Sequence, residues 1–260
     1  ENGSGKTTLM NILSGIYYPD AGHIIVNGQE VTIRSPRDVY DLGIGMVHQH
    51  FKLVDVLTAA ENIILGMPGK GKLDLKAVGD KIRSICALYG FEVNPEQKIY
   101  DMSVSQKQTV EIVKVLFRGA SILILDEPTA VLTPQETKKL FCVLRNMKND
   151  GKAVVIITHK LHEVEEISDR VVVLRRGQYV GELATKDTNA AEMTNMMVGH
   201  QVSLNIARPE PKDPKPRLVV DHLTVKDPDG ITKLEDVSFT AYSGEVLGIA
   251  GISGCGQKEL

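Results

Sequence analysis

The sequence contains no tryptophan, only three cysteines and no long hydrophobic run. Cys86, Cys142 and Cys255 lie far apart and form no C-x-x-C pair, which argues against disulfides or a zinc site and fits a reducing compartment. No apolar stretch approaches the roughly 20 residues that a membrane-spanning helix requires. The net charge of −3 gives no sign of a nucleic-acid partner. At 260 residues, the chain has room for one full domain and part of another.

The first eight residues, Glu1–Thr8, carry the end of a phosphate-binding loop. Gly5, Lys6 and Thr7 complete the pattern G-x-x-x-x-G-K-[ST], whose first glycine would precede Glu1. Small residues let backbone N–H groups surround a polyphosphate, and the following helix adds the positive end of its dipole. We expect Lys6 to reach the β- and γ-phosphates and the Thr7 hydroxyl to ligate Mg²⁺, although a plain glycine-rich turn is the simpler alternative. Such a loop normally follows a buried strand, so the chain reads as a fragment of a longer protein.

Two acids, Asp126 and Glu127, follow the apolar stretch Leu123–Leu125. If this stretch is a buried strand, Asp126 lies beside the Mg²⁺ and Glu127 polarises an attacking water. Acids at the end of a strand often only cap the next turn, and Pro128 fits that interpretation. The upstream Gly-Lys-Thr favours the catalytic one.

Single polar residues follow two further expected strands. Gln49 comes after a strand over 44–48, and His159 follows a strand over 153–158. Parallel strands deliver such residues to the crevice in which α/β proteins bind nucleotides. We expect Gln49 to touch Mg²⁺ or the water and His159 to hydrogen-bond the γ-phosphate, although residues of these types are usually structural.

Ser103, Val104, Ser105 and Gln106 open an expected amphipathic helix. Ser103 and Gln106 form an S-x-x-Q capping box, which is a sufficient structural explanation. The same residues also look like a degraded L-S-G-G-Q pattern. In that interpretation, the Ser103 hydroxyl and the helix N-terminus meet the γ-phosphate of a nucleotide that another domain holds.

The apolar periodicity predicts a parallel α/β core with a helical insertion. Strands are expected at 22–27, 44–48, 121–126, 153–158, 170–174 and 179–183, helices at 7–15, 135–148 and 161–167, and mostly helix over 55–118. Residues 122–125 and 154–157 are apolar at every position, as central parallel strands are.

A second unit is expected after a stiff linker over 200–216, which contains Pro209, Pro211, Pro214 and Pro216. Residues 218–225, 237–240 and 246–250 then read as strands. The last leads into a glycine-rich loop over 251–257 that repeats the phosphate-loop pattern, with Gln257 in place of the lysine. We therefore expect a first domain at 1–199, with a helical subdomain at about 55–118, and the N-terminal part of a second, degenerate copy of that domain at 217–260.

With these pieces in order, the chain resembles the ATP-binding subunits of ABC transporters, most closely the fused two-domain type that serves nucleoside and simple-sugar importers. The matching segments are the Walker A loop (Gly3–Thr8), the Q-loop (Gln49), the signature (Ser103–Gln106), Walker B (Ile122–Glu127), the D-loop (Ala130–Thr133) and the switch histidine (His159). The resemblance implies the P-loop NTPase core of an ABC ATPase, with antiparallel β strands and a helical subdomain, plus the start of a second ABC domain.

The resemblance also implies the site and its ligands, ATP and Mg²⁺. The residues expected to bind the nucleotide are Asn2, Gly3, Ser4, Gly5, Lys6, Thr7, Thr8, Ser103, Val104, Ser105 and Gln106. The catalytic residues are Glu127, His159 and Gln49, and the metal ligands are Thr7, Gln49 and Asp126. The implied function is ATP hydrolysis at the cytoplasmic face of the membrane, coupled to uptake of nucleosides or simple sugars. Permease subunits, a second ABC domain in the same chain and, indirectly, an extracytoplasmic solute-binding protein are the implied partners, with no nucleic acid.

The sequence departs from the family pattern at several positions. Met102 replaces the signature leucine, Ser105 its last glycine, and Thr109 a usual arginine, and the D-loop lacks S-A-L-D. Because ABC domains pair head to tail, Ser105 and Gln257 would belong to one weakened site, whereas Lys6 would serve a hydrolytic one. The 260 residues alone should therefore turn over ATP slowly or not at all. A soluble ABC ATPase of translation or DNA repair and a non-hydrolytic nucleotide-binding regulator are the alternatives.

Overall fold

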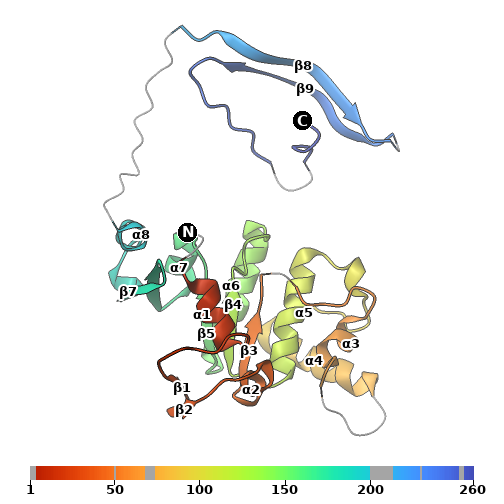
Figure 1. Cartoon of the computed structure of the whole chain (residues 1–260). Helices are drawn as coiled ribbons and strands as arrows, with labels where there is room; N and C mark the ends of the chain where they lie inside the picture. The colour runs from red at the N-terminus through yellow and green to blue at the C-terminus, as the bar shows by residue number, and fades with distance from the viewer. Residues whose placement is uncertain (1–3, 50, 68–73, 200–212, 229, 252–254) are drawn as a thin grey trace. The chain divides into compact units, whose positions relative to one another are not determined.

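The computed structural model describes residues 4–49, 51–67, 74–199, 213–228, 230–251 and 255–260. The chain divides into two compact units, Glu1–Val202 and Ser203–Leu260. The first unit contains a parallel sheet, two antiparallel hairpins and the helices that surround them (Figure 1). The second contains one long antiparallel hairpin.

A three-stranded parallel sheet forms the centre of the first unit. Its order is β3 (Ile44–Val47), β4 (Ile122–Asp126) and β5 (Ala153–Ile157). The carboxyl ends of these strands therefore lie along one edge, where residues that follow different strands meet. The helices α6 (Pro134–Asn149) and α7 (Leu161–Ile167) follow β4 and β5, as the sequence predicts.

Apolar side chains cover β4 on both faces, which confirms it as a central strand. Leu123 and Leu125 pack with residues of α5 (Val104–Phe117) and α6, whose Phe141 is fully buried. Ile124 packs in a separate cluster with Met10 of α1 (Lys6–Leu13). Helices on both faces thus hold β4, and the acids at its end, in a fixed position.

The helical region expected over 55–118 is confirmed. It comprises α3 (Ala59–Ile64), α4 (Leu75–Tyr89), the short 3₁₀ helix η1 (Ile99–Asp101) and α5, and Figure 1 shows the three α-helices together on one side of the unit. They share a hydrophobic core that includes Ile63, Ile82 and Val113. Because α5 contributes to this core and to the core under the sheet, it joins the two parts.

Two hairpins and two further helices complete the first unit. The strands β1 (Ile24–Val26) and β2 (Gln29–Val31) flank Asn27-Gly28, whose positive φ values of 51° and 79° suit a tight hairpin turn. The strands β6 (Arg170–Arg175) and β7 (Gln178–Ala184) form the second hairpin. The strand β2 is not among the elements that the sequence predicts, nor are the segments α2 (Pro36–Asp41), η2 (Thr185–Asp187) and α8 (Ala190–Val198).

The strand β5 differs from the prediction that both of its faces are covered. Among the described residues it pairs only with β4, and Val155 is 43% exposed. An apolar groove of about 550 Å³ runs between β5 and β6, lined by residues that include Leu9, Val155 and Val172. Apolar sequence predicts that a surface is to be covered, but it does not identify what covers it.

The second unit differs from the prediction in its last strand. The strands β8 (Pro216–Lys226) and β9 (Thr232–Tyr242) include the expected 218–225 and 237–240 and extend beyond them. The expected strand at 246–250 is wrong: these residues are not in a strand, and Val246 is 99% exposed. A strand requires a neighbour for its backbone hydrogen bonds, and this segment pairs with no described strand. Most of the predicted linker, 200–212, lies outside the described residues.

Candidate nucleotide site

The phosphate loop turns sharply at Gly5, directly before α1. The φ of Gly5 is +90°, and a Cβ atom there would lie 3.0 Å from the Cα of Gly177, in the β6–β7 turn. The Gly177 N–H donates to the Ser4 carbonyl at 3.1 Å. Both the backbone conformation and this close approach require a glycine. Asn2 and Gly3, also expected to bind the nucleotide, lie outside the described residues.

The donors at the start of α1 fit an anion. The first N–H groups of an α-helix have no partner within the helix. In α1 no side chain caps them, and no acid lies in the first turn. Thr7 and Thr8 are exposed in that turn. The Ser4 hydroxyl is buried and lacks a hydrogen-bond partner among the described residues. An oxygen-rich ligand would supply the acceptors that these groups lack.

The two acids at the end of β4 have different environments. Burial, and then the neighbouring Glu127 carboxylate, raise the pKa of Asp126, whereas the Lys6 ammonium opposes this rise. Lys6 is therefore close enough to act on Asp126. Glu127 has a left-handed backbone with φ of 47°, and its N–H donates to the Ile157 carbonyl at 2.9 Å. Such strain in a residue other than glycine persists only where the surroundings hold it, often at functional sites.

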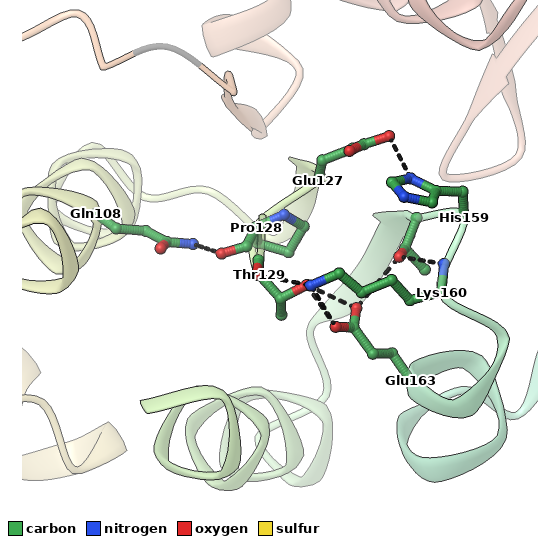
Figure 2. A network of polar contacts seen from close by, with 8 residues as sticks. Gln108, Glu127, Pro128, Thr129, His159, Lys160 and Glu163 are labelled. Atoms are coloured by element: carbon green, nitrogen blue, oxygen red, sulfur yellow. Dashed lines mark hydrogen bonds and ion pairs between the residues drawn. The ribbon is translucent and has the colours of Figure 1, made fainter. Parts of the chain in front are cut away.

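His159 lies beside Glu127, as Figure 2 shows. Its Nδ1 is 2.9 Å from Glu127 Oε1. The pairing follows from the sheet, because β4 and β5 are neighbours and each residue comes just after its strand. The His159 side chain is 54% exposed, so the pair faces solvent on one side.

Gln49 joins the acids around a small cavity. It follows β3, and it lines a cavity of about 100 Å³ together with Asp126 and Glu127. The polar groups and the volume suit bound water. The structure thus brings together Gln49, Asp126, Glu127 and His159 at one edge of the sheet, with Lys6 near Asp126.

The segment Ser103–Gln106 lines neither this cavity nor the groove. Ser103 and Gln106 form the predicted capping box: the Gln106 N–H donates to Ser103 Oγ at 3.3 Å, and the Ser103 N–H donates to Gln106 Oε1 at 2.9 Å. The Ser105 hydroxyl, followed by the Thr133 backbone, holds the pKa of Glu136 below its ordinary value. Val104 is exposed in the first turn of α5. The structural interpretation of this segment is therefore observed, and its interaction with a second domain stays a prediction.

Sequence reasoning missed several polar residues around the acids. Gln108 Nε2 donates to the Pro128 carbonyl at 2.6 Å, inside the protein. Thr129, Lys160 and Glu163 form a second group of contacts behind Glu127 and His159 (Figure 2). The available signal was weak: Thr129 follows the acids by two positions, and Glu163 lies in the first turn of α7, where acids are common caps.

Neither a metal cluster nor a membrane span occurs in the described part of the chain. No group of three or more His, Cys, Asp or Glu side chains is placed to hold a metal ion there. None of the described helices has the length and apolar character needed to cross a bilayer.

The chain is similar to the nucleotide-binding components of importers. It is 49% identical to the guanosine import ATP-binding protein NupO of Bacillus subtilis, aligned over 100% of this chain and 51% of that protein. It is 47% identical to the nucleoside import ATP-binding protein NupA of Lactococcus lactis, over 100% of this chain and 52% of that protein. It is 41% identical to the glucose import ATP-binding protein TsgD13 of Haloferax volcanii, over 100% of this chain and 53% of that protein. The chain thus spans about half the length of the curated relatives it matches.

Solved structures agree with the fold. A nucleotide-free ATP-binding cassette from an ABC transporter matches with 26% identity and a TM-score of 0.62, over 71% of this chain and 78% of that chain. An ATP-binding cassette of an ABC transporter in its ADP conformation matches with 25% identity and a TM-score of 0.66, over 76% and 85%. The family profile described as ABC transporter matches residues 1–130, half of the chain. The chain belongs to the ABC transporter family.

Proposed function

We propose that the protein to which this chain belongs binds MgATP and hydrolyses it to drive solute import. The observation that carries this proposal is the pairing of Glu127 with His159 at 2.9 Å, at the strand edge that also bears Asp126. An acid, a histidine and a second acid on adjacent parallel strands, with a lysine from a phosphate loop close to them, are the groups that phosphoryl transfer to water requires.

In this proposal, binding falls to the loop and the start of α1. Lys6 neutralises charge on the β- and γ-phosphates, while the N–H groups of the first turn, which no side chain caps, donate hydrogen bonds to the phosphate oxygens. The oxygens of Thr7, Asp126 and Gln49 are the hard ligands that Mg²⁺ prefers. Bound Mg²⁺ would neutralise the charge that develops on the transferred phosphoryl group.

Hydrolysis falls to the pair at the strand ends. The Glu127 carboxylate accepts a hydrogen bond from the attacking water and orients it, and His159 donates to the γ-phosphate. The two side chains contact each other, so both can act on the same phosphoryl group. Gln49, on the cavity that both acids line, orients water beside the metal.

We further propose that the two nucleotide sites of the complete protein differ. In a head-to-tail pair of domains, Ser103–Gln106 would complete the site of the second phosphate loop, where Gln257 stands in the place of the lysine. Gln257 has no charge to offer a phosphate, so that site would be mainly structural. Lys6, Asp126 and Glu127 would form the hydrolytic one.

The relatives support import of a nucleoside or a simple sugar. Two relatives at 49% and 47% identity carry guanosine and nucleoside import names, and others at 41% and 40% carry glucose and ribose import names. We infer that the protein acts with permease subunits at the cytoplasmic face of the membrane. A solute-binding protein outside the membrane would deliver the solute to the permease.

The full-length gene product, purified with its permease and reconstituted in vesicles, tests this function. We expect Mg²⁺-dependent ATP hydrolysis and nucleoside or sugar uptake. Glu127→Gln should lower the turnover by roughly 10²-fold or more and leave ATP binding intact, because it removes only the water-orienting carboxylate. Gln257→Ala should change the turnover by less than about twofold, as truncation of a side chain at the edge of an interface does. Comparable losses from the two substitutions would contradict the division of labour, and no MgATP binding would contradict the function.

A further inference from the structure

Glu163 is a buried carboxylate that the proposed chemistry does not use. Only 2% of the residue is exposed, although it lies in the first turn of the short helix α7. Burying an ionised carboxylate is unfavourable unless several partners compensate it. The burial of the Glu163 carboxylate therefore has to be explained by the partners that it binds.

Its partners come from both loops that carry the proposed catalytic pair. Thr129 Oγ1 lies 2.6 Å and 2.7 Å from the two carboxylate oxygens, and Thr158 Oγ1 donates to the carboxylate at 3.2 Å. Lys160 Nζ forms an ion pair with Glu163 at 3.2 Å and also donates to the Thr129 carbonyl at 2.8 Å. Thr129 follows Glu127 by two residues, whereas Thr158 and Lys160 are the neighbours of His159. Figure 2 shows these contacts behind the pair.

These contacts and the Glu127–His159 contact together form a ring that joins the two loops at two places, an outer side and an inner side. On its outer side, Glu127 and His159 interact directly, but the His159 side chain is 54% exposed. A polar contact that water reaches is weak and does not fix a geometry by itself. On the inner side, Thr129 is 1% exposed and Glu163 is equally dry, so their hydrogen bonds are shielded from water. Beyond the β4–β5 backbone pairing, which includes the hydrogen bond from the Glu127 N–H to the Ile157 carbonyl, the inner side is thus the stronger link between the loops.

The backbone of Glu127 gives a second reason for such a brace. Its φ of 47° is unfavourable for a residue with a side chain, and it persists only if the following residues are held. Thr129, two positions later, is anchored by its hydroxyl to Glu163 and by its carbonyl to Lys160. A brace at this point keeps the Glu127 carboxylate directed toward His159.

We propose that Glu163 is a positioning residue, whose buried carboxylate clamps the loops after β4 and β5 at the separation that lets Glu127 and His159 act on one phosphoryl group. This inference rests on the proposed ATP hydrolysis. It adds that the geometry of the pair is set from behind, by Thr129, Thr158 and Lys160, and not by the pair's own contact.

Glu163→Gln tests the clamp in the full-length gene product with its permease. The substitution keeps the volume but replaces one acceptor oxygen by an NH₂ group, so one of the Thr129 and Lys160 contacts is lost. We expect kcat to fall roughly 10- to 100-fold, because small displacements of catalytic groups have effects of that size. KM for ATP should stay within about twofold, since the phosphate loop and α1 are on other elements. Glu165→Gln, at an exposed position of the same helix, is the matched control and should leave both constants unchanged.

Thr129 provides an independent pair of variants. Thr129→Val removes the hydroxyl at nearly constant volume and should lower kcat like Glu163→Gln, whereas Thr129→Ser keeps the donor and should restore it. The double variant Thr129→Val/Glu163→Gln should lose little more than either single one, because both break the same ring. A kcat that survives Glu163→Gln and Thr129→Val would overturn the proposal. The proposal would also fail if Thr129→Ser lowered kcat as much as Thr129→Val does. It would fail as well if Glu163→Gln and Thr129→Val lowered the ATP affinity and the melting temperature as much as kcat.

Hydrogen exchange separates this inference from the proposed function. In the nucleotide-free protein, Glu163→Gln should speed exchange of the backbone amides of residues 129–132 and 158–161 several-fold and leave those of α1 unchanged. Should the wild-type protein lack ATPase activity, the proposed function fails, and this measurement still decides whether the clamp exists. Unchanged exchange in both loops would rule it out.

Discussion

At the scale of single residues, two acidic side chains stand next to each other at the end of β4, and one lysine opposes their repulsion. Asp126 and Glu127 are adjacent, and Lys6 is the cation that acts on Asp126. Burial and the second carboxylate raise the pKa of Asp126, so its ionised form is disfavoured in the folded protein. This is the arrangement expected of a group that is neutralised by a bound cation.

Asp126→Asn should stabilise the nucleotide-free protein and remove its Mg²⁺ response. A carboxyl group whose folded pKa is raised adds stability at low pH and loses that stability as the pH rises through the folded pKa. At pH 7 the ionised Asp126 is therefore unfavourable, and the neutral amide relieves this. For a chain of this size, each kcal/mol gained raises the melting temperature by roughly 2–4 °C. Thermal melts at pH 7, with and without MgATP, check both effects, and a lower melting temperature of the nucleotide-free variant would contradict the explanation.

At the scale of elements, α5 connects the parts of the proposed site. Gln108 donates to the Pro128 carbonyl at 2.6 Å, and Glu111, one turn later, accepts from the Lys52 N–H at 2.7 Å. One face of the helix thus holds both the loop after β4 and the segment after Gln49. The N-terminus of the same helix carries Ser103. A partner domain that contacts Ser103 would therefore act on a rigid element that reaches both loops.

A second link joins α4 to the end of α6. The hydroxyl of buried Tyr89 donates to Asp150 Oδ2 at 2.5 Å. Burial, and then the Asp150 carboxylate, raise the pKa of Tyr89 from its ordinary 10.0 to about 12. Because the folded pKa is raised, the stability from this link is complete below about pH 10 and is lost as the pH rises toward 12. Urea denaturation between pH 9 and 11.5 should show that loss in the wild type and a smaller one in Tyr89→Phe; parallel curves would contradict it.

The sequence predicted the elements whose signals are local. The apolar run Ile122–Leu125 and the Gly-Lys-Thr of the loop identified β4 and α1, and the order of strands then brought Glu127 and His159 together. Signals that depend on distant partners were read less well. Residues 246–250 look like a strand but pair with no strand among the described residues. The role of Glu163 follows from its burial, which local sequence does not encode.

At the scale of the whole molecule, the groove between β5 and β6 is the main incomplete feature. The edge of β5 away from β4 has no strand beside it in the described part of the chain, and Val155 and Val172 line the groove. The phosphate-loop pattern predicts a buried strand ahead of Glu1. Lys6 and Leu9 of α1 also line the groove, so a strand that leads into the loop would reach it directly. We expect that strand to occupy the groove in the full-length gene product.

Val155→Asp distinguishes an open groove from an occupied one. In the 260-residue chain, Val155 is 43% exposed, so the carboxylate stays hydrated and should cost no more than about 0.5 kcal/mol. In the full-length gene product, a strand over Val155 would bury the same carboxylate without a partner, at a cost of roughly 2–4 kcal/mol. Urea denaturation of both proteins, each against its own wild type, measures the difference. Leu88→Asp, at a 62% exposed position of α4, is the control and should cost little in either protein. Equal small losses of stability for Val155→Asp in the two proteins would show that no strand covers β5. A covering strand would bury the carboxylate and lower the stability of the full-length protein much more.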